Sequence, residues 1–285
     1  AISFAYRITE GYNQTYMENL SETHERLSDD EVEQQLSEVC NFFKEFRQEL
    51  LSITGNVDFL TKDDGSPVTE LDVKVETELK ERFAVAYPHT AVFGEETGRY
   101  NVDHHHFWLI DPIDGTKSFV EGEPVFTNMA ALIENGETRA SVIYNPVRDD
   151  TYTAIKGTGT YKNGVKVQLD SVNPEPVFLL KKELFTDVRG VLGDVDVRFV
   201  NPPSGGGDGF TQILDGIVAA RFQMHASGSA HDYAPGALLI YEAGGVILPI
   251  KQDSYTFETT SFIATHSDYA ELLKGLVPRI RQFEF

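Results

Sequence analysis

Apolar positions recur at steps of three and four residues along two stretches in the first third of the chain. One stretch covers residues 32–50 and follows Ser28 and Glu31, which have the spacing of a helical capping box. The other covers residues 68–83 and is preceded by the polar segment 58–67. The pattern predicts two long amphipathic helices joined by a polar turn.

Shorter apolar runs, bounded by glycine, proline or asparagine, make up most of the remaining chain and predict strands. The predicted strands cover residues 91–93, 108–110, 126–133, 140–144, 151–155, 160–169, 177–180, 197–200, 246–249 and 262–265. Further helices are predicted at residues 184–191, 210–220, 232–244 and 267–276. A proline and a charge cluster near residue 147 predict a division into two halves, 1–147 and 148–285.

The chain is strongly acidic, with a formal net charge of -21 over 285 residues. Because no surplus of basic residues is available to displace counterions, the composition argues against a nucleic-acid partner or an anionic membrane. An anionic substrate would be repelled unless bound metal cations reversed the local charge. A chain of this composition that binds phosphate esters therefore needs metal ions.

The single cysteine, Cys40, lies in the first predicted helix and excludes an intrachain disulfide or a thiolate zinc cluster. We interpret it as a small core residue. No apolar stretch has the length of a membrane span, and the first residues lack a basic segment followed by an apolar one. We therefore expect a soluble cytoplasmic protein.

The most informative stretch is residues 108–119, WLIDPIDGTKSF. Three apolar residues end in Asp111, Asp114 follows three positions later, and Gly115 comes directly after it. A short buried strand of this kind places carboxylates at the rim of a sheet beside free backbone N–H groups, which suits a hard divalent cation and a phosphate. The same residues also make a good turn, because proline fixes φ, aspartate caps its own backbone and glycine takes positive φ.

Other acids lie at the ends of predicted elements. Glu95 and Glu96 follow the strand at 91–93 and repeat the pattern of an apolar strand that ends in carboxylates. Asp232 opens one predicted helix, and Asp72 lies in the first turn of another. Each also has a simpler interpretation, as solvated charge for the glutamates and as helix-capping or dipole residues for the aspartates.

The glycine-rich segment 202–209 precedes the predicted helix at 210–220. It lacks the lysine of a phosphate-binding loop, so we interpret it as a flexible connection. The alternative is that its glycines let the backbone approach a bound ligand.

Together these segments resemble the inositol monophosphatase superfamily of magnesium-dependent, lithium-sensitive phosphatases. The resemblance rests on GEE at 94–96, DPIDGT at 111–116, and a helix that starts at Asp232 and ends in EAGG at 242–245. It extends from about residue 30 to residue 275. It implies a layered α/β/α/β/α sandwich, usually assembled as a homodimer, that hydrolyses a small phosphorylated alcohol.

By position, the resemblance implies two or three Mg²⁺ ions per site. Glu95, Asp111 and the carbonyl of Ile113 would hold the first ion. Asp111, Asp114 and Asp232 would hold the second, and a third, weaker ion would share Glu95 with water molecules. In such enzymes a water activated by the cation attacks phosphorus in line, and the second metal stabilises the leaving alkoxide.

The resemblance also assigns roles around the ester. Thr116, paired with Asp72, would orient the attacking water, and Glu95 completes the catalytic set. The N–H groups of Gly115 and Thr116 would hold phosphate oxygens. The implied substrate-binding residues are Gly115, Thr116, Asp114, His225 and Asp232.

The resemblance defines the substrate less closely. Inositol-selective members carry a glutamate seven positions before the last metal-binding aspartate, where this chain has His225, and a tryptophan where it has His231. The segment 117–119, KSF, is similar to the histidinol-phosphate phosphatase branch and, less closely, to the branch that hydrolyses 3′-phosphoadenosine 5′-phosphate. We expect a substrate similar to inositol monophosphate, with those two as alternatives. A non-catalytic acidic protein that binds metal ions or phosphometabolites is the hypothesis from another class.

Overall fold

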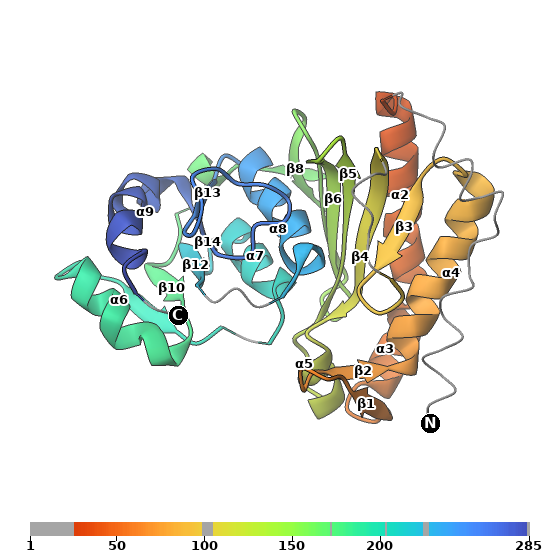
Figure 1. Cartoon of the computed structure of the whole chain (residues 1–285), viewed down its shortest axis with the longest axis horizontal. Helices are drawn as coiled ribbons and strands as arrows, with labels where there is room; N and C mark the ends of the chain where they lie inside the picture. The colour runs from red at the N-terminus through yellow and green to blue at the C-terminus, as the bar shows by residue number, and fades with distance from the viewer. Residues whose placement is uncertain (1–25, 99–104, 172, 203, 225–227, 284–285) are drawn as a thin grey trace.

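The computed structural model describes residues 26–98, 105–171, 173–202, 204–224 and 228–283, in which two sheets alternate with layers of helices (Figure 1). The helices are α2 (Asp29–Glu45), α3 (Arg47–Ile53), α4 (Glu70–Ala86), α5 (Thr116–Glu121), α6 (Phe185–Leu192), α7 (Gly207–Leu214), α8 (Ala230–Glu242) and α9 (Ser267–Ile280). Helices α2 and α4 cover the outer face of the larger sheet, α7 and α8 lie between the sheets, and α6 and α9 cover the outer face of the smaller sheet. The predicted α/β/α/β/α sandwich is confirmed.

The larger sheet contains seven strands in the order β3-β4-β5-β6-β7-β8-β9. They are β3 (Ala91–Gly94), β4 (His106–Asp114), β5 (Thr127–Glu134), β6 (Glu137–Asn145), β7 (Asp150–Ile155), β8 (Gly159–Lys162) and β9 (Val165–Val167). Strands β3 and β4 are parallel, and the other neighbours are antiparallel. This sheet continues past residue 147 as far as β9. The division of the chain into two halves at residue 147 stays a prediction.

The smaller sheet contains five strands in the order β11-β10-β12-β14-β13. They are β10 (Val177–Leu179), β11 (Arg198–Val200), β12 (Ala220–Gln223), β13 (Val246–Pro249) and β14 (Phe262–Thr265). Strand β10 pairs in parallel with β11 and β12, and β14 pairs antiparallel with β12 and β13. The sheet is therefore mixed.

Two hairpins of the larger sheet have the turns that their sequences predict. Asn135 and Gly136 join β5 to β6 with φ of 52° and 79°, and Asn163 and Gly164 join β8 to β9 with φ of 51° and 79°. Positive φ at both central residues is the requirement of the two-residue turn that matches strand twist, and asparagine followed by glycine meets it with little strain.

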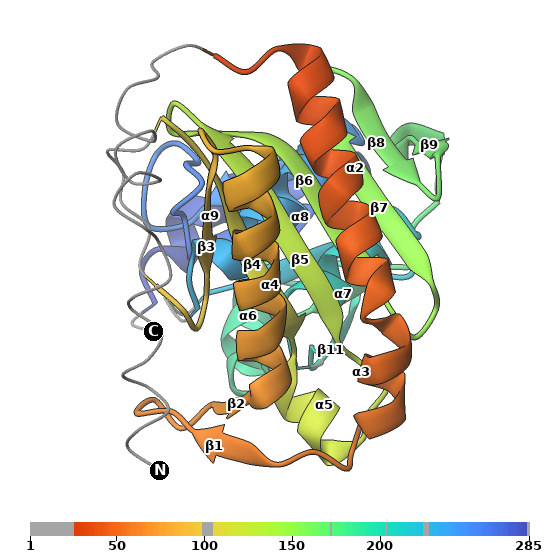
Figure 2. The same ribbon diagram turned by 90° about the vertical axis from the view of Figure 1, so that its right-hand side faces the viewer.

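Helices α2 and α4 lie side by side across the larger sheet (Figure 2). Ser28 and Glu31 form the predicted capping box at the start of α2. The Trp108 indole on β4 donates a hydrogen bond of 2.9 Å to the Gln35 side chain, so the helix is tied to the sheet inside the core. The single helix predicted for residues 32–50 is divided at Phe46, which ends α2 and begins α3.

The helix predicted at 210–220 is wrong beyond Leu214. Helix α7 ends there, Gly216 takes a φ of 71°, and the chain then enters β12, the middle strand of the smaller sheet. The apolar run that follows Gly216 satisfies a helical and a strand pattern equally well, because short buried runs carry no clear period.

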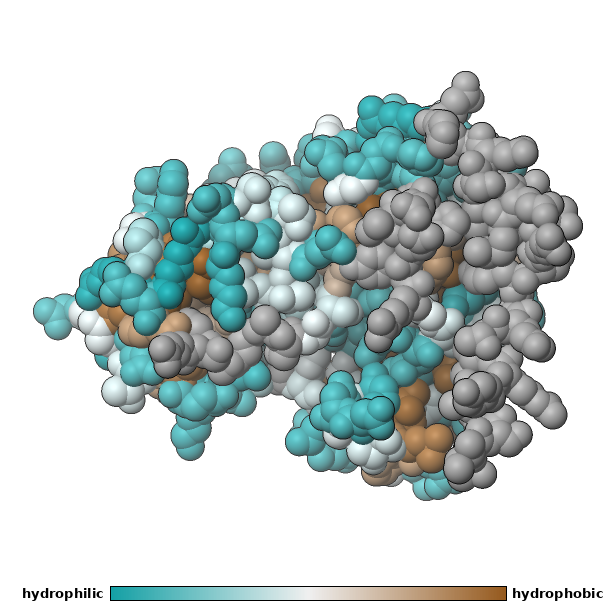
Figure 3. Space-filling model, in the orientation of Figure 1, coloured by the Kyte–Doolittle hydropathy of each residue, from teal (hydrophilic) through white to brown (hydrophobic). Residues whose placement is uncertain are grey.

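The polar segment 58–67 contains a hairpin rather than a simple turn. Strand β1 (Phe59–Thr61) pairs antiparallel with β2 (Pro67–Thr69). Phe59 and Leu60 on β1 are 50% and 58% exposed, and Figure 3 shows an apolar patch over this hairpin. The hairpin brings Lys62, the residue after β1, toward the loop that follows β3.

Candidate metal site

Asp111 and Asp114 both come from the end of β4, a strand that is buried along its whole length. In a regular strand, residues three apart point to opposite faces of the sheet. Here the pairing with β5 shifts, because Asp111 lies opposite Met129 whereas Asp114 lies opposite Thr127. The extra residue forms a bulge, which turns both carboxylates toward the same space.

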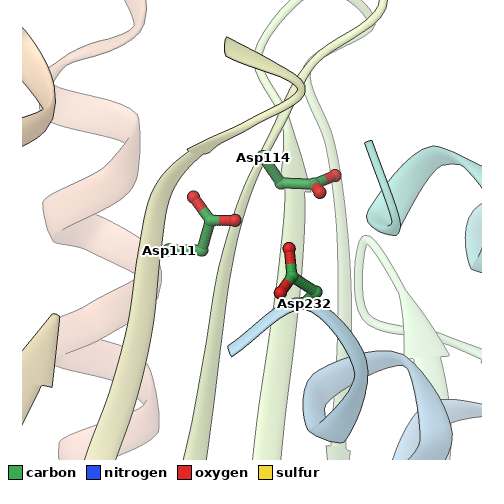
Figure 4. A group of neighbouring side chains, drawn as sticks. All are labelled: Asp111, Asp114 and Asp232. Carbon is green, nitrogen blue, oxygen red and sulfur yellow. The ribbon is translucent and has the colours of Figure 1, made fainter. Parts of the chain in front are cut away.

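Asp232 reaches this space from the start of α8. Ser229 is the N-cap of that helix, and the Asp232 carboxylate accepts hydrogen bonds from the Ser229 N–H at 2.6 Å and its hydroxyl at 3.3 Å. One carboxylate oxygen from each of Asp111, Asp114 and Asp232, the carboxylate cluster, lies within 4.8 Å of the other two (Figure 4). Asp232 therefore both caps the helix and belongs to the cluster.

The carboxylate cluster concentrates negative charge in a buried place. Among the described residues, none of its three members forms a salt bridge. Burial, followed by the charges of Glu95 and Asp114, raises the pKa of Asp111 well above its usual value. Burial and the charge of Asp114 raise the pKa of Asp232 to about 7. Buried carboxylate oxygens without a basic partner are suitable ligands for Mg²⁺, so the donor set fits that cation.

The glycine-rich loop before α7 holds Asp114. The N–H groups of Gly206 and Gly207 donate hydrogen bonds of 2.6 and 2.7 Å to the Asp114 carboxylate, and the Thr127 hydroxyl donates a third of 3.0 Å. Burial raises the pKa of Asp114, and the two N–H groups oppose that rise. A Cβ at position 207 would collide with the Thr127 hydroxyl. The glycines thus permit the close backbone approach that was the alternative interpretation, with a protein carboxylate as the partner.

Glu95 lies directly after β3, beside the cluster. Its N–H donates to the carbonyl of Ile110 at 3.2 Å. Its charge is the second-largest cause, after burial, of the raised pKa of Asp111. The Lys62 ammonium lies 2.7 Å from carboxylate oxygens of both Glu95 and Glu96. Lys62 lies in the polar segment 58–67. Its local sequence does not indicate that it pairs with Glu95 and Glu96, which lie 33 and 34 residues further along the chain.

Asp72 and Thr116 lie at the starts of two helices and are bonded to different partners. The Asp72 carboxylate accepts hydrogen bonds from the Thr69 N–H at 2.8 Å and hydroxyl at 2.7 Å, which closes the capping box of α4. Burial raises the pKa of Asp72 to about 7. The Thr116 hydroxyl donates to the Ile113 carbonyl at 2.8 Å. The capping interpretation of Asp72 is confirmed, whereas its expected pairing with Thr116 is not formed in this arrangement.

Gly115 connects β4 to α5 with a φ of 91°, a conformation that favours glycine. A Cβ at this position would lie 3.0 Å from the carbonyl oxygens of Ser204 and Val125. The tight fit brings the backbone between Asp114 and α5 against the loop before α7.

His231 and His225 occupy positions where inositol-selective members of the family that the sequence resembles carry other residues. His231 is buried on α8, and its Nδ1 lies 2.9 Å from the Ser229 hydroxyl. Burial lowers the pKa of His231 to about 4, so its ring is neutral at pH 7. His225 lies outside the described residues.

Nearly the whole described chain matches one family model, that of the inositol monophosphatase family, over residues 26–282. The chain belongs to the inositol monophosphatase family. The resemblance inferred from the motifs is confirmed, and the protein is a phosphoric monoester hydrolase of this family.

Named relatives include more than one kind of phosphatase. An inositol monophosphatase of Dictyostelium discoideum is 33% identical over 64% of this chain and 71% of its own length. An inositol-1-monophosphatase of Rhizobium meliloti is 28% identical over 83% of this chain and 89% of its own length. A histidinol-phosphatase of Chlorobaculum parvum is 30% identical over 65% of this chain and 73% of its own length.

Solved structures share the fold. The IMPase of Thermotoga maritima superimposes with a TM-score of 0.75 at 21% identity, covering 87% of this chain and 98% of that one. An IMPase/NADP phosphatase complexed with Mg²⁺ and phosphate gives a TM-score of 0.72 at 18% identity, covering 88% and 96%. Among the described residues, no helix is both long and apolar enough to cross a membrane.

Proposed function

We propose that this chain hydrolyses the monophosphate of a small alcohol with Mg²⁺ bound at the carboxylate cluster. The observation that carries the proposal is the convergence of three carboxylates within 4.8 Å, with Asp111 and Asp114 buried and Asp232 partly buried, and with no salt bridge to any of them among the described residues. The complex of a structural relative with Mg²⁺ and phosphate supports it.

We assign the cations to the ligands implied by position. Glu95, Asp111 and the Ile113 carbonyl form one site, and Asp111, Asp114 and Asp232 form a second. A third, weaker site would use Glu95. Mg²⁺ bound at these sites would neutralise the charge of the phosphate, activate a water and stabilise the leaving alkoxide.

The protein groups around the cluster position the ester and the water. The N–H groups of Gly115 and Thr116 bind phosphate oxygens in this proposal, and Asp72 acts with the Thr116 hydroxyl and Glu95 to orient the attacking water. The hydroxyl must then exchange its bond to the Ile113 carbonyl for one to the water.

For the substrate, we propose an alcohol similar to inositol monophosphate, with Asp114, Asp232 and His225 among the residues that bind it. Histidinol phosphate and 3′-phosphoadenosine 5′-phosphate are the alternatives. The names of the relatives, which include inositol monophosphatases and a histidinol-phosphatase, support the first two candidates.

The test is phosphate release from inositol 1-phosphate, histidinol phosphate, 3′-phosphoadenosine 5′-phosphate and fructose 1,6-bisphosphate, compared by kcat/KM. We expect turnover that requires Mg²⁺ and falls at least about a hundredfold in Asp111→Asn and Asp232→Asn, more than the loss of an outer-shell partner usually costs. Asp170→Asn, at an exposed position, is the matched control and keeps full activity. Binding of Mg²⁺ without release of phosphate from any ester would instead favour the non-catalytic hypothesis.

We further propose a cytoplasmic, lithium-sensitive homodimer that binds neither nucleic acid nor membranes. The net charge of -21 supports the absence of polyanionic partners. Light scattering gives the mass in solution, and addition of Li⁺ to the phosphate-release assay tests the inhibition. A monomer at micromolar concentration would contradict the dimer.

A further inference from the structure

The carboxylate of Glu76 lies fully buried on α4, outside the metal ligands proposed above. It accepts hydrogen bonds of 2.8 Å from the N–H groups of Glu96 and Thr97, and a further bond from the Thr97 hydroxyl. All three donors belong to the loop that follows β3 and carries Glu95. A buried carboxylate is therefore hydrogen-bonded by the backbone of one loop.

Gly94 makes room for this carboxylate. A Cβ at position 94 would fall within bonding range of the Glu76 carboxylate carbon and oxygens. Gly94 ends β3 and does not have a positive φ, so its backbone conformation does not require glycine. Glycine is required here because a side chain would occupy the space of the Glu76 carboxylate. Positions 76 and 94 are therefore sterically matched.

Lys80 reinforces the contact one turn further along α4. Its ammonium donates to the Thr97 carbonyl at 3.1 Å and also contacts the Thr97 hydroxyl. Helix α4 thus holds the loop with an acceptor, Glu76, and a donor, Lys80.

Both sides of Glu95 are consequently held. On one side Gly94 pairs with Ile110 of β4, and the Glu95 N–H donates to the carbonyl of Ile110. On the other side Glu76 binds the next two N–H groups. These bonds fix the backbone of Glu95, so only its side-chain torsions can still change. The position of its carboxylate is therefore narrowly defined.

We infer that Glu76 is a positioning residue for Mg²⁺ binding, which acts through the loop carrying Glu95 and with Lys80 as its support. The inference rests on the proposed function, because it gives Glu95 the role of a ligand. Groups that orient metal ligands commonly affect metal affinity by about 10–100-fold.

The test compares Mg²⁺ binding with folding stability. Glu76→Gln keeps the size of the side chain but replaces one carboxylate oxygen by an N–H₂ group. One of the two backbone N–H groups then faces a donor and loses its acceptor. Val75→Ala is the matched control, because Val75 is an apolar residue buried in the core on the same helix. Stability is measured by urea unfolding in EDTA, and affinity by calorimetric titration with Mg²⁺ alone.

We expect about tenfold weaker Mg²⁺ binding in Glu76→Gln, while Val75→Ala loses stability and keeps the wild-type Kd. Gly94→Ala, which displaces the carboxylate without removing it, weakens binding in the same way, and the double variant adds little to either change. If Glu76→Gln does not fold, Lys80→Met tests the supporting contact, with a smaller loss of affinity expected.

The outcomes separate this inference from the proposed function. Wild-type affinity in folded Glu76→Gln, or in Lys80→Met where it replaces it, overturns the positioning role and leaves the metal site standing. A wild-type protein that binds no Mg²⁺ overturns both.

Discussion

Two groups of acidic side chains lie along α7, and they differ in their partners. The carboxylate cluster lies at the N-terminus of the helix, where Gly207 donates to Asp114. The other group, the ionic cluster, runs along the helix toward β7 and β8. It consists of Arg148, Asp150, Lys162, Asp208 and Asp215.

Every acid of the ionic cluster has a basic partner within the chain. The Lys162 ammonium lies 3.1 Å from Asp150 and 3.0 Å from Asp215, and the Tyr152 hydroxyl donates to Asp215 at 2.8 Å. Burial alone would raise the pKa of Asp150, but hydrogen bonds from Asn163 and Lys162 bring it below its usual value. Arg148 and Lys162 thus offset most of the charge of the three acids, and the ionic cluster joins α7 to the larger sheet.

Among the described residues, the carboxylate cluster forms no salt bridge. Burial raises the pKa of each member, and at Asp114 it outweighs the charge of Arg221, which lowers that pKa. The contrast shows why a count of acidic residues does not identify a metal site. What distinguishes the two groups is whether basic side chains form salt bridges with the acids; in the proposed function, the carboxylate cluster takes its cation from solution.

The largest expected difference between the clusters is their response to Mg²⁺. At a concentration about 100 times Kd, the cation should stabilise the wild-type fold by about 2.7 kcal/mol, because it binds only the folded state. Asp215→Asn should keep this gain, whereas Asp232→Asn should lose most of it. Urea unfolding in EDTA and in MgCl₂ measures the gain, and an equal gain in both variants would remove the distinction.

Without Mg²⁺, the same two substitutions should act in opposite directions at pH 8. Asp215→Asn removes the partner of Lys162 and should destabilise the fold by about 1–2 kcal/mol. Asp232→Asn removes one of three repelling charges while its amide oxygen can still accept from Ser229, so we expect a gain of about 1 kcal/mol. Both values come from urea unfolding in EDTA. Destabilisation by Asp232→Asn would show that repulsion among the three carboxylates does not dominate in the metal-free fold.

A third difference is the pH dependence of the ionic cluster. Because the pKa of Asp150 is lowered in the fold, the unfolded chain binds more protons near that pKa, and stability rises with pH there. The contribution is present above the ordinary value of 3.8 and is lost as pH falls through the lowered pKa. Asp150→Asn should therefore destabilise the fold equally at pH 8 and pH 5, by up to about 1 kcal/mol, and less near pH 3. A deficit that persists unchanged at pH 3 would argue against the charge as its origin.

The contrast between the clusters also marks what the sequence could predict. Asp111 and Asp114 stood out because an apolar strand ends in them, and Asp232 because a helix starts beside it. These are local signals, produced by strand alternation and helix capping. The meeting of Asp232 with the other two was expected only from the resemblance to a family, since no local rule places segments so far apart in the chain together.

Features that depend on packing between segments could not be predicted. The bulge that turns Asp111 and Asp114 to one side appears only when β4 pairs with β5. The glycines at 206 and 207 were interpreted as flexible because their partner, Asp114, lies far away in the sequence. Strand β12 was not predicted, because the helix assigned to 210–220 ran up to its first residue, Ala220, and the apolar run after Gly216 carries no clear period.

The smallest expected effect concerns Lys62, a cation that forms a salt bridge with one of the proposed ligands. Lys62 pairs with Glu95 at 2.7 Å, on side chains that are 26% and 31% exposed, so it competes with Mg²⁺ for that carboxylate. Pairs of this exposure contribute about 0.2–1 kcal/mol, which limits the gain in Mg²⁺ affinity of Lys62→Met to about fivefold. Lys74→Met, which removes an exposed pair with Glu49 on the outer helices, is the matched control and should leave the affinity unchanged. Calorimetric titration with Mg²⁺ gives both values, and weaker binding in Lys62→Met would mean that the lysine supports the Glu95 ligand rather than competing for it.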